Sequence, residues 1–177
     1  MDDMGQYINF DASQVLIVGG RPHSVQVLRQ ALSLAGVKNA RFVEEPQPAV
    51  DLLRTESFLA VFCEPCEFDT KAFILAARRT EGIRQPMIPI FLVCLRPRQQ
   101  DVEAARDLGF TNVIARPLSA GTLRRKLRSA LGQPRTFIAT SNFFGPDRRT
   151  RAGHWNGQER RERLPRKVKV AASQEAE

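Results

Sequence analysis

Two hydrophobic patterns alternate along the first three quarters of the chain. Short runs that are apolar almost throughout, as expected of strands buried on both faces, are clearest at residues 58–63 and 88–94. Between the runs, apolar residues recur every three or four positions, which is the spacing of one helix face. The runs predict strands at residues 14–18, 41–43, 58–63, 88–94 and 111–115, and the periodic segments predict helices at residues 22–35, 48–54, 69–79, 98–108 and 119–131.

Strict alternation of five strands and five helices is typical of α/β proteins with a parallel sheet covered by helices on both faces. Right-handed crossovers favour a doubly wound, flavodoxin-like (βα)5 arrangement, whose functional cleft lies at the carboxyl ends of the strands. We therefore predict an N-terminal extension at residues 1–12, this domain at residues 13–132 and a connector at residues 133–144.

The character of the chain changes after residue 144. Residues 148–169 contain nine basic and two acidic residues, so they carry +7 of the net charge of +8. A segment with few apolar residues and a high net charge cannot bury enough surface to fold alone. We predict that residues 145–177 form an Arg-rich, largely disordered tail. Phe137, Phe143 and Phe144 are expected to hold its start against the domain.

Composition excludes some classes of protein. No apolar stretch approaches the roughly 20 residues that a membrane-spanning helix needs. The acidic start, Met1-Asp2-Asp3-Met4, is not followed by the apolar segment of a secretory signal. Three cysteines do not make a disulfide framework. We expect a cytoplasmic protein without a membrane span.

Three segments resemble the receiver domains of bacterial response regulators. Residues 102–109 (VEAARDLG) and 113–119 (VIARPLS) are similar to the fourth helix, fifth strand and Lys-Pro turn of CheY-like receivers. Residues 143–149 (FFGPDRR) resemble the extension that follows the receiver in one bacterial subgroup. The resemblance covers about 130 residues. It implies a receiver fold and a role in two-component signalling or a phosphorelay.

In receivers, two acidic residues bind Mg²⁺, an aspartate accepts the phosphoryl group, a hydroxyl contacts it and a lysine neutralises it. The resemblance places the acidic pair on Gly19 and Gly20, the hydroxyl on Cys94 and the lysine on Arg116. Glycines cannot ligate a metal, and phosphoryl transfer depends on positioning and on charge stabilisation by the metal. We expect a degenerate pseudo-receiver without Mg²⁺, without useful phosphorylation and without enzymatic activity.

The phosphoacceptor position stays open between two residues. Ungapped counting from the flanking motifs selects Glu64, whereas the apolar pattern of the strand favours Cys63. An ion pair between Glu64 and Arg116 across the cleft would imitate the phosphorylated state; the alternative is an ordinary salt bridge at a strand end. The aromatic switch residue of receivers aligns with Val113, so the usual relay is absent.

The cysteines suggest a second class of function. Cys63 and Cys66 have the spacing of a redox pair, and Cys94 and His23 would complete a tetrahedral zinc site if the sheet brought them together. Cysteines at strand ends are more often small buried apolar residues. A thiol-redox or zinc-binding protein using Cys63, Cys66 and Cys94 is therefore an alternative to signalling.

The tail supplies the candidate ligand-binding residues, which are Arg148, Arg149, Arg151, Trp155, Arg160 and Arg161. Arginine forks match phosphate oxygens and the Hoogsteen edge of guanine, and Arg and Trp planes stack on bases. Some CheY-like proteins bind cyclic di-GMP through an Arg-rich extension that this tail resembles, so we expect this second messenger as a regulatory ligand. The alternatives are an unspecific, solvating tail and, less favoured, salt-sensitive nucleic-acid binding.

Together these features predict a non-enzymatic signalling adaptor with no resident cofactor. The resemblance implies that the face of the fourth helix, fifth strand and fifth helix docks a protein partner, such as a histidine kinase or a motility component. Ordering of the tail around its ligand would change this docking. The alternative within signalling is a pseudo-receiver that acts by docking alone.

Overall fold

The computed structural model describes residues 14–66, 68–132, 136–140, 143–147 and 166–168. Five parallel strands form the main sheet in the order β2-β1-β3-β4-β5, which is the flavodoxin-like order predicted from the sequence. The strands are β1 (Gln14–Gly19), β2 (Asn39–Val43), β3 (Val61–Glu64), β4 (Ile90–Leu95) and β5 (Asn112–Arg116).

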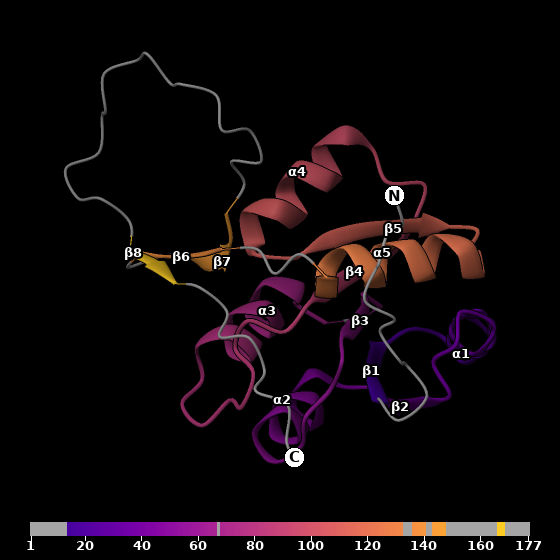
Figure 1. Ribbon diagram of the computed structural model, residues 1–177, viewed down its shortest axis with the longest axis horizontal. Coiled ribbons are helices and arrows are strands. Elements are labelled where there is room, and N and C mark those ends of the chain that lie inside the picture. The colour runs from indigo at the N-terminus through magenta and orange to yellow at the C-terminus, as the bar shows by residue number, and fades with distance from the viewer. Residues whose placement is uncertain (1–13, 67, 133–135, 141–142, 148–165, 169–177) are drawn as a thin grey trace, which may run out of the picture.

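Five helices join these strands and cover both faces of the sheet (Figure 1). They are α1 (Pro22–Leu34), α2 (Pro46–Thr55), α3 (Thr70–Arg79), α4 (Gln99–Leu108) and α5 (Ala120–Gly132). Helices α1 and α5 pack on one face around Leu28 and Leu123. Helices α2, α3 and α4 pack on the other face around Leu53, Phe73 and Ala105. The two cores are separated by the buried strands, as a doubly wound sheet requires.

Local chemistry explains most element boundaries. Helices α1 and α2 each begin with a proline, whose fixed φ suits the first helical turn, and this starts α2 earlier than predicted. Asp69 caps α3 by accepting hydrogen bonds from two backbone N–H groups of the first turn. The third strand begins at Val61 rather than at residue 58, and the N–H of Phe58 donates to the side chain of Gln85 at 2.8 Å.

A second, antiparallel sheet follows the main one, with the order β7-β6-β8. Its strands are β6 (Phe137–Ala139), β7 (Phe144–Pro146) and β8 (Arg166–Val168). Residues 145–146 and 166–168, which lie within the segment predicted to be largely disordered, are therefore strand residues. Such short strands give almost no periodic signal, and their backbone groups are satisfied only by tertiary pairing. The prediction for residues 148–165 and 169–177 falls outside the described residues.

The small sheet lies beside α3 and α4 (Figure 1) and is held there by an aromatic contact. The ring of Phe137 is buried, 5.5 Å from the ring of Phe144 and 5.0 Å from the guanidinium of Arg78. Arg78 is itself buried and donates hydrogen bonds to the carbonyls of Pro86 (2.7 Å) and Ile88 (2.6 Å). The expected anchoring of this segment by Phe137 and Phe144 is confirmed.

Within the described residues, no helix combines the length and apolar character needed to cross a membrane.

Candidate functional site at the carboxyl edge of the sheet

The carboxyl ends of β1, β3, β4 and β5 bring the predicted site positions to one edge of the sheet. Gly19 on β1 lies in register with Glu64 on β3. Cys94 on β4 lies in register with Ala115, the residue before Arg116 on β5. Residues 75 positions apart in the sequence, such as Gly19 and Cys94, thus lie at the same edge of the sheet, as the predicted topology requires.

Glu64 and Arg116 form an ion pair across this cleft. Nη2 of Arg116 donates to Oε2 of Glu64 and also to the carbonyl oxygen of Ser24 in α1, at 3.3 Å. The two side chains are only 14% and 16% exposed, so water screens the charges weakly. One guanidinium therefore ties together β3, β5 and α1.

The structure decides between the two residues at the end of β3. Cys63 has no exposed surface and packs in the core on the side of α2 and α3. Burial, followed by the neighbouring charge of Glu64, raises the pKa of the Cys63 thiol to about 12. Because successive side chains of a strand point to opposite faces, Glu64 is the residue that enters the cleft. This is the residue that ungapped counting selects.

Gly19 and Gly20 form a turn that leaves no space for side chains. Their φ values are +72° and +96°, a region that L residues rarely adopt. A Cβ on Gly19 would lie 2.5 Å from the carbonyl oxygen of Glu64 and 2.5 Å from the ring of Phe68. A Cβ on Gly20 would lie 3.0 Å from Oε2 of Glu64. The ring of Phe68 occupies the position into which a side chain at residue 19 would project.

These residues do not fit the Mg²⁺ ion that the receiver resemblance implies. Mg²⁺ is held by carboxylate and water oxygens in an octahedral arrangement. The cleft offers the carboxylate of Glu64, which already pairs with Arg116, and the two glycines offer no side-chain oxygen. Among the described residues, no three His, Cys, Asp or Glu side chains cluster closely enough to hold a metal ion. The donor set therefore does not support a metal-dependent step.

The three cysteines lie in different environments. Cys63 is buried, Cys66 is exposed and Cys94 is partly buried, and all three are free thiols. Burial and, to a smaller extent, Asp101 raise the pKa of Cys94. A redox pair needs a thiol whose pKa is lowered, whereas that of Cys63 is raised. The described residues also do not gather the cysteines with His23 into a metal-binding cluster, so neither the redox nor the zinc alternative finds support here.

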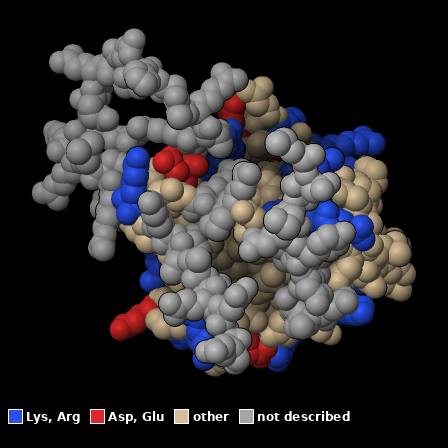
Figure 2. Space-filling view, viewed as in Figure 1, with Lys and Arg blue, Asp and Glu red and all other residues tan. Residues whose placement is uncertain are grey.

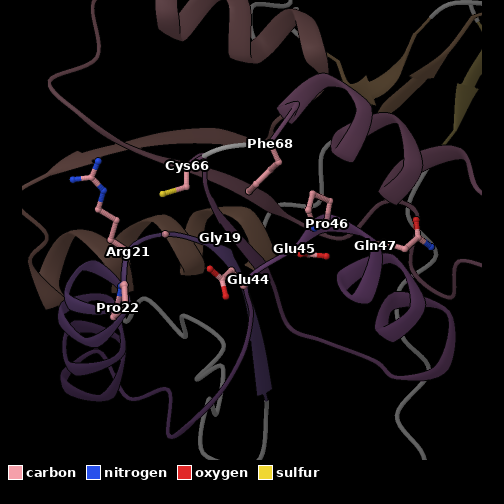
Figure 3. Close-up of a pocket in the computed structure, with 10 residues that line it drawn as sticks. Gly19, Arg21, Pro22, Glu44, Glu45, Pro46, Gln47, Cys66 and Phe68 are labelled. Carbon is pink, nitrogen blue, oxygen red and sulfur yellow. The ribbon is translucent and has the colours of Figure 1, made fainter.

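A pocket of about 670 Å³ adjoins the glycine turn (Figure 3). It is lined by the loops that precede α1, α2 and α3, namely by Gly19, Gly20, Arg21, Pro22, Glu44, Glu45, Pro46, Gln47, Cys66 and Phe68. Figure 3 shows the side chain of Arg21 pointing away from the carboxylates of Glu44 and Glu45. No sequence motif predicts this pocket, because its three loops become neighbours only when the sheet forms.

The tail residues predicted to bind a ligand, Arg148, Arg149, Arg151, Trp155, Arg160 and Arg161, lie outside the described residues. The neighbouring strands show where this segment starts and ends. Strands β7 and β8, which flank the segment in the sequence, pair with opposite edges of β6.

No protein-family model matches the chain, and no curated protein matches its sequence. Solved structures do match its fold. The receiver domain of a sensor histidine kinase from Pseudomonas aeruginosa, with magnesium in its active-site cleft, is 21% identical with a TM-score of 0.59; the match covers 68% of this chain and 98% of that one. A histidine-kinase receiver domain from Syntrophus aciditrophicus is 23% identical, with a TM-score of 0.57 and coverages of 75% and 100%.

A chemotaxis response regulator of Vibrio cholerae is 18% identical, with a TM-score of 0.54 and coverages of 67% and 98%. These matches span nearly the whole of each receiver and cover about two thirds to three quarters of this chain. At such identities the likeness is one of fold, and it agrees with the strand order and helix layers described above. The chain therefore has the fold of the CheY-like receiver domains of bacterial response regulators.

Proposed function

We propose that this chain is a signalling adaptor that uses the receiver fold as a binding module, without phosphorylation and without catalysis. The observation that carries the proposal is the Glu64–Arg116 ion pair beside a turn of two glycines. A phosphorylatable receiver needs carboxylates for the metal and an accessible acceptor at this place. Here the carboxylate that enters the cleft is already neutralised by an arginine.

The ion pair is suited to act as a permanent counterpart of a phosphoryl group. The carboxylate of Glu64 projects one methylene further than that of an aspartate. Arg116 on β5 forms the ion pair with it. Arg116 also holds the carbonyl of Ser24, so the pair fixes α1 relative to two strands. Val113, which is buried on β5, replaces the aromatic switch residue that the resemblance implies. Both features favour one fixed state over a toggle.

We infer that the output is protein docking through the face of α4, β5 and α5. Two observations support an available surface there. Leu95, at the end of β4, is 72% exposed, and Ala115 on β5 is exposed. These two exposed apolar residues stand near the carboxyl ends of the paired strands β4 and β5. A histidine kinase or a motility component is the kind of partner that the resemblance implies.

The test of phosphorylation is direct. The purified chain is incubated with acetyl phosphate and Mg²⁺, and intact-mass spectrometry looks for the mass of one added phosphoryl group. A chemotaxis receiver with a complete acidic pair is the positive control. We expect an adduct on the control and none on this chain. An adduct on Glu64 would overturn the proposal.

The role of the Glu64–Arg116 ion pair is tested by a measurement other than stability. Amide chemical shifts of the Glu64→Gln variant are compared with those of the unchanged chain. If the pair sets the state of the docking face, shifts extend from the cleft to α4, β5 and the start of α5. Shifts confined to the residues that touch Glu64 would make it an ordinary salt bridge.

The second part of the proposal is that the tail binds a ligand. The support is the sequence of arginines around Trp155 and its resemblance to extensions that bind cyclic di-GMP. Calorimetric titration with cyclic di-GMP at physiological salt, with GTP and a short RNA as controls, is the test. We expect selective binding that is lost in Arg148→Ala/Arg149→Ala and in Trp155→Ala. Equal, salt-sensitive binding of all three ligands would leave only the docking adaptor.

A further inference from the structure

Acidic residues are absent from two long segments of the chain. Residues 12–43 and 108–146 contain no Asp or Glu. Because 19 of the 177 residues are acidic, these 71 positions would carry about eight acidic residues at the average frequency. The same segments contain ten Lys and Arg residues. The segment between them, residues 44–107, contains eleven acidic and eight basic residues.

The fold places the two acid-free segments together. The first contains α1 and the second contains α5, and these helices pack side by side on one face of the sheet. Arg124 of α5 donates hydrogen bonds at 3.2 Å to the carbonyls of Leu34 and Ala35 at the end of α1. Every acidic residue on a described helix therefore belongs to the opposite layer, which is formed by α2, α3 and α4. Figure 2 shows Lys and Arg without Asp or Glu along the side where α1 and α5 lie in Figure 1.

The exposed arginines of this layer lack carboxylate partners within the described part of the chain. No described Asp or Glu pairs with Arg29, Arg125 or Arg128, all of which are exposed. In the opposite layer, by contrast, Arg54 pairs with Asp51 at 3.7 Å and Arg98 pairs with Asp101 at 3.4 Å. The difference leaves a one-sign charge on one layer of the sandwich.

An apolar side chain lies within the same surface. Leu34 is 73% exposed, and its carbonyl is one of the two that Arg124 binds. Arginine is enriched at protein interfaces, and an exposed leucine offers an apolar contact to a partner. Neither α1 nor α5 contains a Phe, Tyr or Trp that would stack on bases. A single leucine is also too small an apolar area to insert into a membrane.

We propose that the α1–α5 face, defined by Arg29, Leu34, Arg124, Arg125 and Arg128, docks an acidic protein surface. The partner presents carboxylates around one apolar residue that packs on Leu34. Arginine forks bind carboxylates in a bidentate manner, and unpaired surface charges of one sign speed encounter with a partner of the other sign. This face is a second interaction surface, beside the one formed by α4, β5 and α5.

The test uses a synthetic helical peptide with glutamates around one leucine as the probe. It is titrated into the isotope-labelled full chain, and amide chemical shifts locate the contact. We expect shifts on α1 and α5. These shifts should persist in the Arg160→Glu/Arg161→Glu variant, whose less basic tail competes less with this face for the glutamates of the peptide. Arg125→Glu/Arg128→Glu should weaken binding about tenfold, because two attractive contacts become repulsive. Leu34→Ala should also weaken it, at low and at high salt.

The matched control is Lys71→Glu/Arg84→Glu, which makes the same change in net charge at exposed positions outside both docking faces. It should keep binding within about twofold, because it removes no contact. Thermal melts establish that each variant is folded. Equal weakening by both double variants, or shifts on the tail alone, would overturn the proposal. Tighter binding of this face to a short DNA duplex or to phosphatidylglycerol vesicles would also overturn it.

Discussion

At the scale of single residues, the carboxyl edge of the sheet combines two glycines with a shielded ion pair. Gly19 and Gly20 carry no side-chain carboxylate, and the ring of Phe68 fills the space beside Gly19. Glu64 has Arg116 as its partner. The stability of this arrangement rests on a charge pair that is mostly shielded from water, so loss of either charge leaves the other one uncompensated.

The Glu64→Gln variant tests this directly. It leaves the guanidinium of Arg116 without a counter-charge in a largely buried cleft, and we expect a loss of about 2 kcal/mol in the free energy of unfolding. Glu56→Gln is the control, because Glu56 pairs with Arg41 at 2.6 Å on the surface, with side chains 30% and 51% exposed. A surface pair contributes less than about 1 kcal/mol. Urea unfolding curves of both variants give the comparison, and equal losses would contradict the prediction.

The cysteines offer a second test at this scale. The thiolate is the reactive form, and at pH 8 a pKa raised to about 12 leaves Cys63 almost entirely protonated, besides its lack of exposed surface. Iodoacetamide should therefore label Cys66 first, Cys94 more slowly, and Cys63 only in denaturant. Peptide mass mapping over time gives the three rates. Labelling of Cys63 as fast as Cys66 in the folded protein would show that the end of β3 opens.

At the scale of elements, the small sheet is the part that the hydrophobic pattern does not reveal. Its contact with the main domain depends on close backbone approach as well as on the ring of Phe137. Gly109 ends α4 with φ +107°, and a Cβ there would lie 3.1 Å from the carbonyl oxygen of Phe144. A glycine is needed at this position for two reasons, the left-handed turn and the approach of β7.

Comparison of two glycines separates these reasons. Gly82→Ala adds backbone strain alone, because its φ is +83° and a Cβ at this position would have no neighbour within 4 Å; we expect a loss of about 1 kcal/mol. Gly109→Ala adds strain and crowds Phe144, so we expect about 2–3 kcal/mol in urea unfolding. Hydrogen exchange of residues 137–146 should quicken in Gly109→Ala alone. Similar exchange in the two variants would mean that β7 does not depend on this approach.

At the scale of the whole molecule, the sheet separates two helix layers with different charge. The extension after α5 packs against the layer of α2, α3 and α4. The contact between Arg78 and Phe137 joins α3 to β6, so contacts made with the domain extend beyond Gly132. The predicted boundary at residue 132 marks the last helix of the sandwich, and we expect the cooperatively folding unit to include β6 and β7 as well.

Two truncations test this boundary. A chain that ends at residue 132 loses the buried ring of Phe137 and uncovers Arg78, and we expect it to be less stable by about 3 kcal/mol, as for removal of a core aromatic. A chain that ends at residue 147 keeps β6 and β7 and should retain most of that stability. Urea unfolding measures both. A chain ending at residue 132 that is as stable as the longer one would show that the extension is not part of the folded unit.

The sequence alone determined the five strands, the five helices and their order, because burial on both faces of a strand and on one face of a helix leaves regular periods in the chain. It also determined that Gly19 and Gly20 supply no metal ligand, since a glycine has no side-chain oxygen whatever the geometry. Tertiary structure decided that Glu64 rather than Cys63 enters the cleft and that Arg116 reaches it. It also decided that short strands after α5 form a second sheet and that the two acid-free segments share one layer. Each of these depends on contacts between residues distant in sequence, which no local pattern encodes.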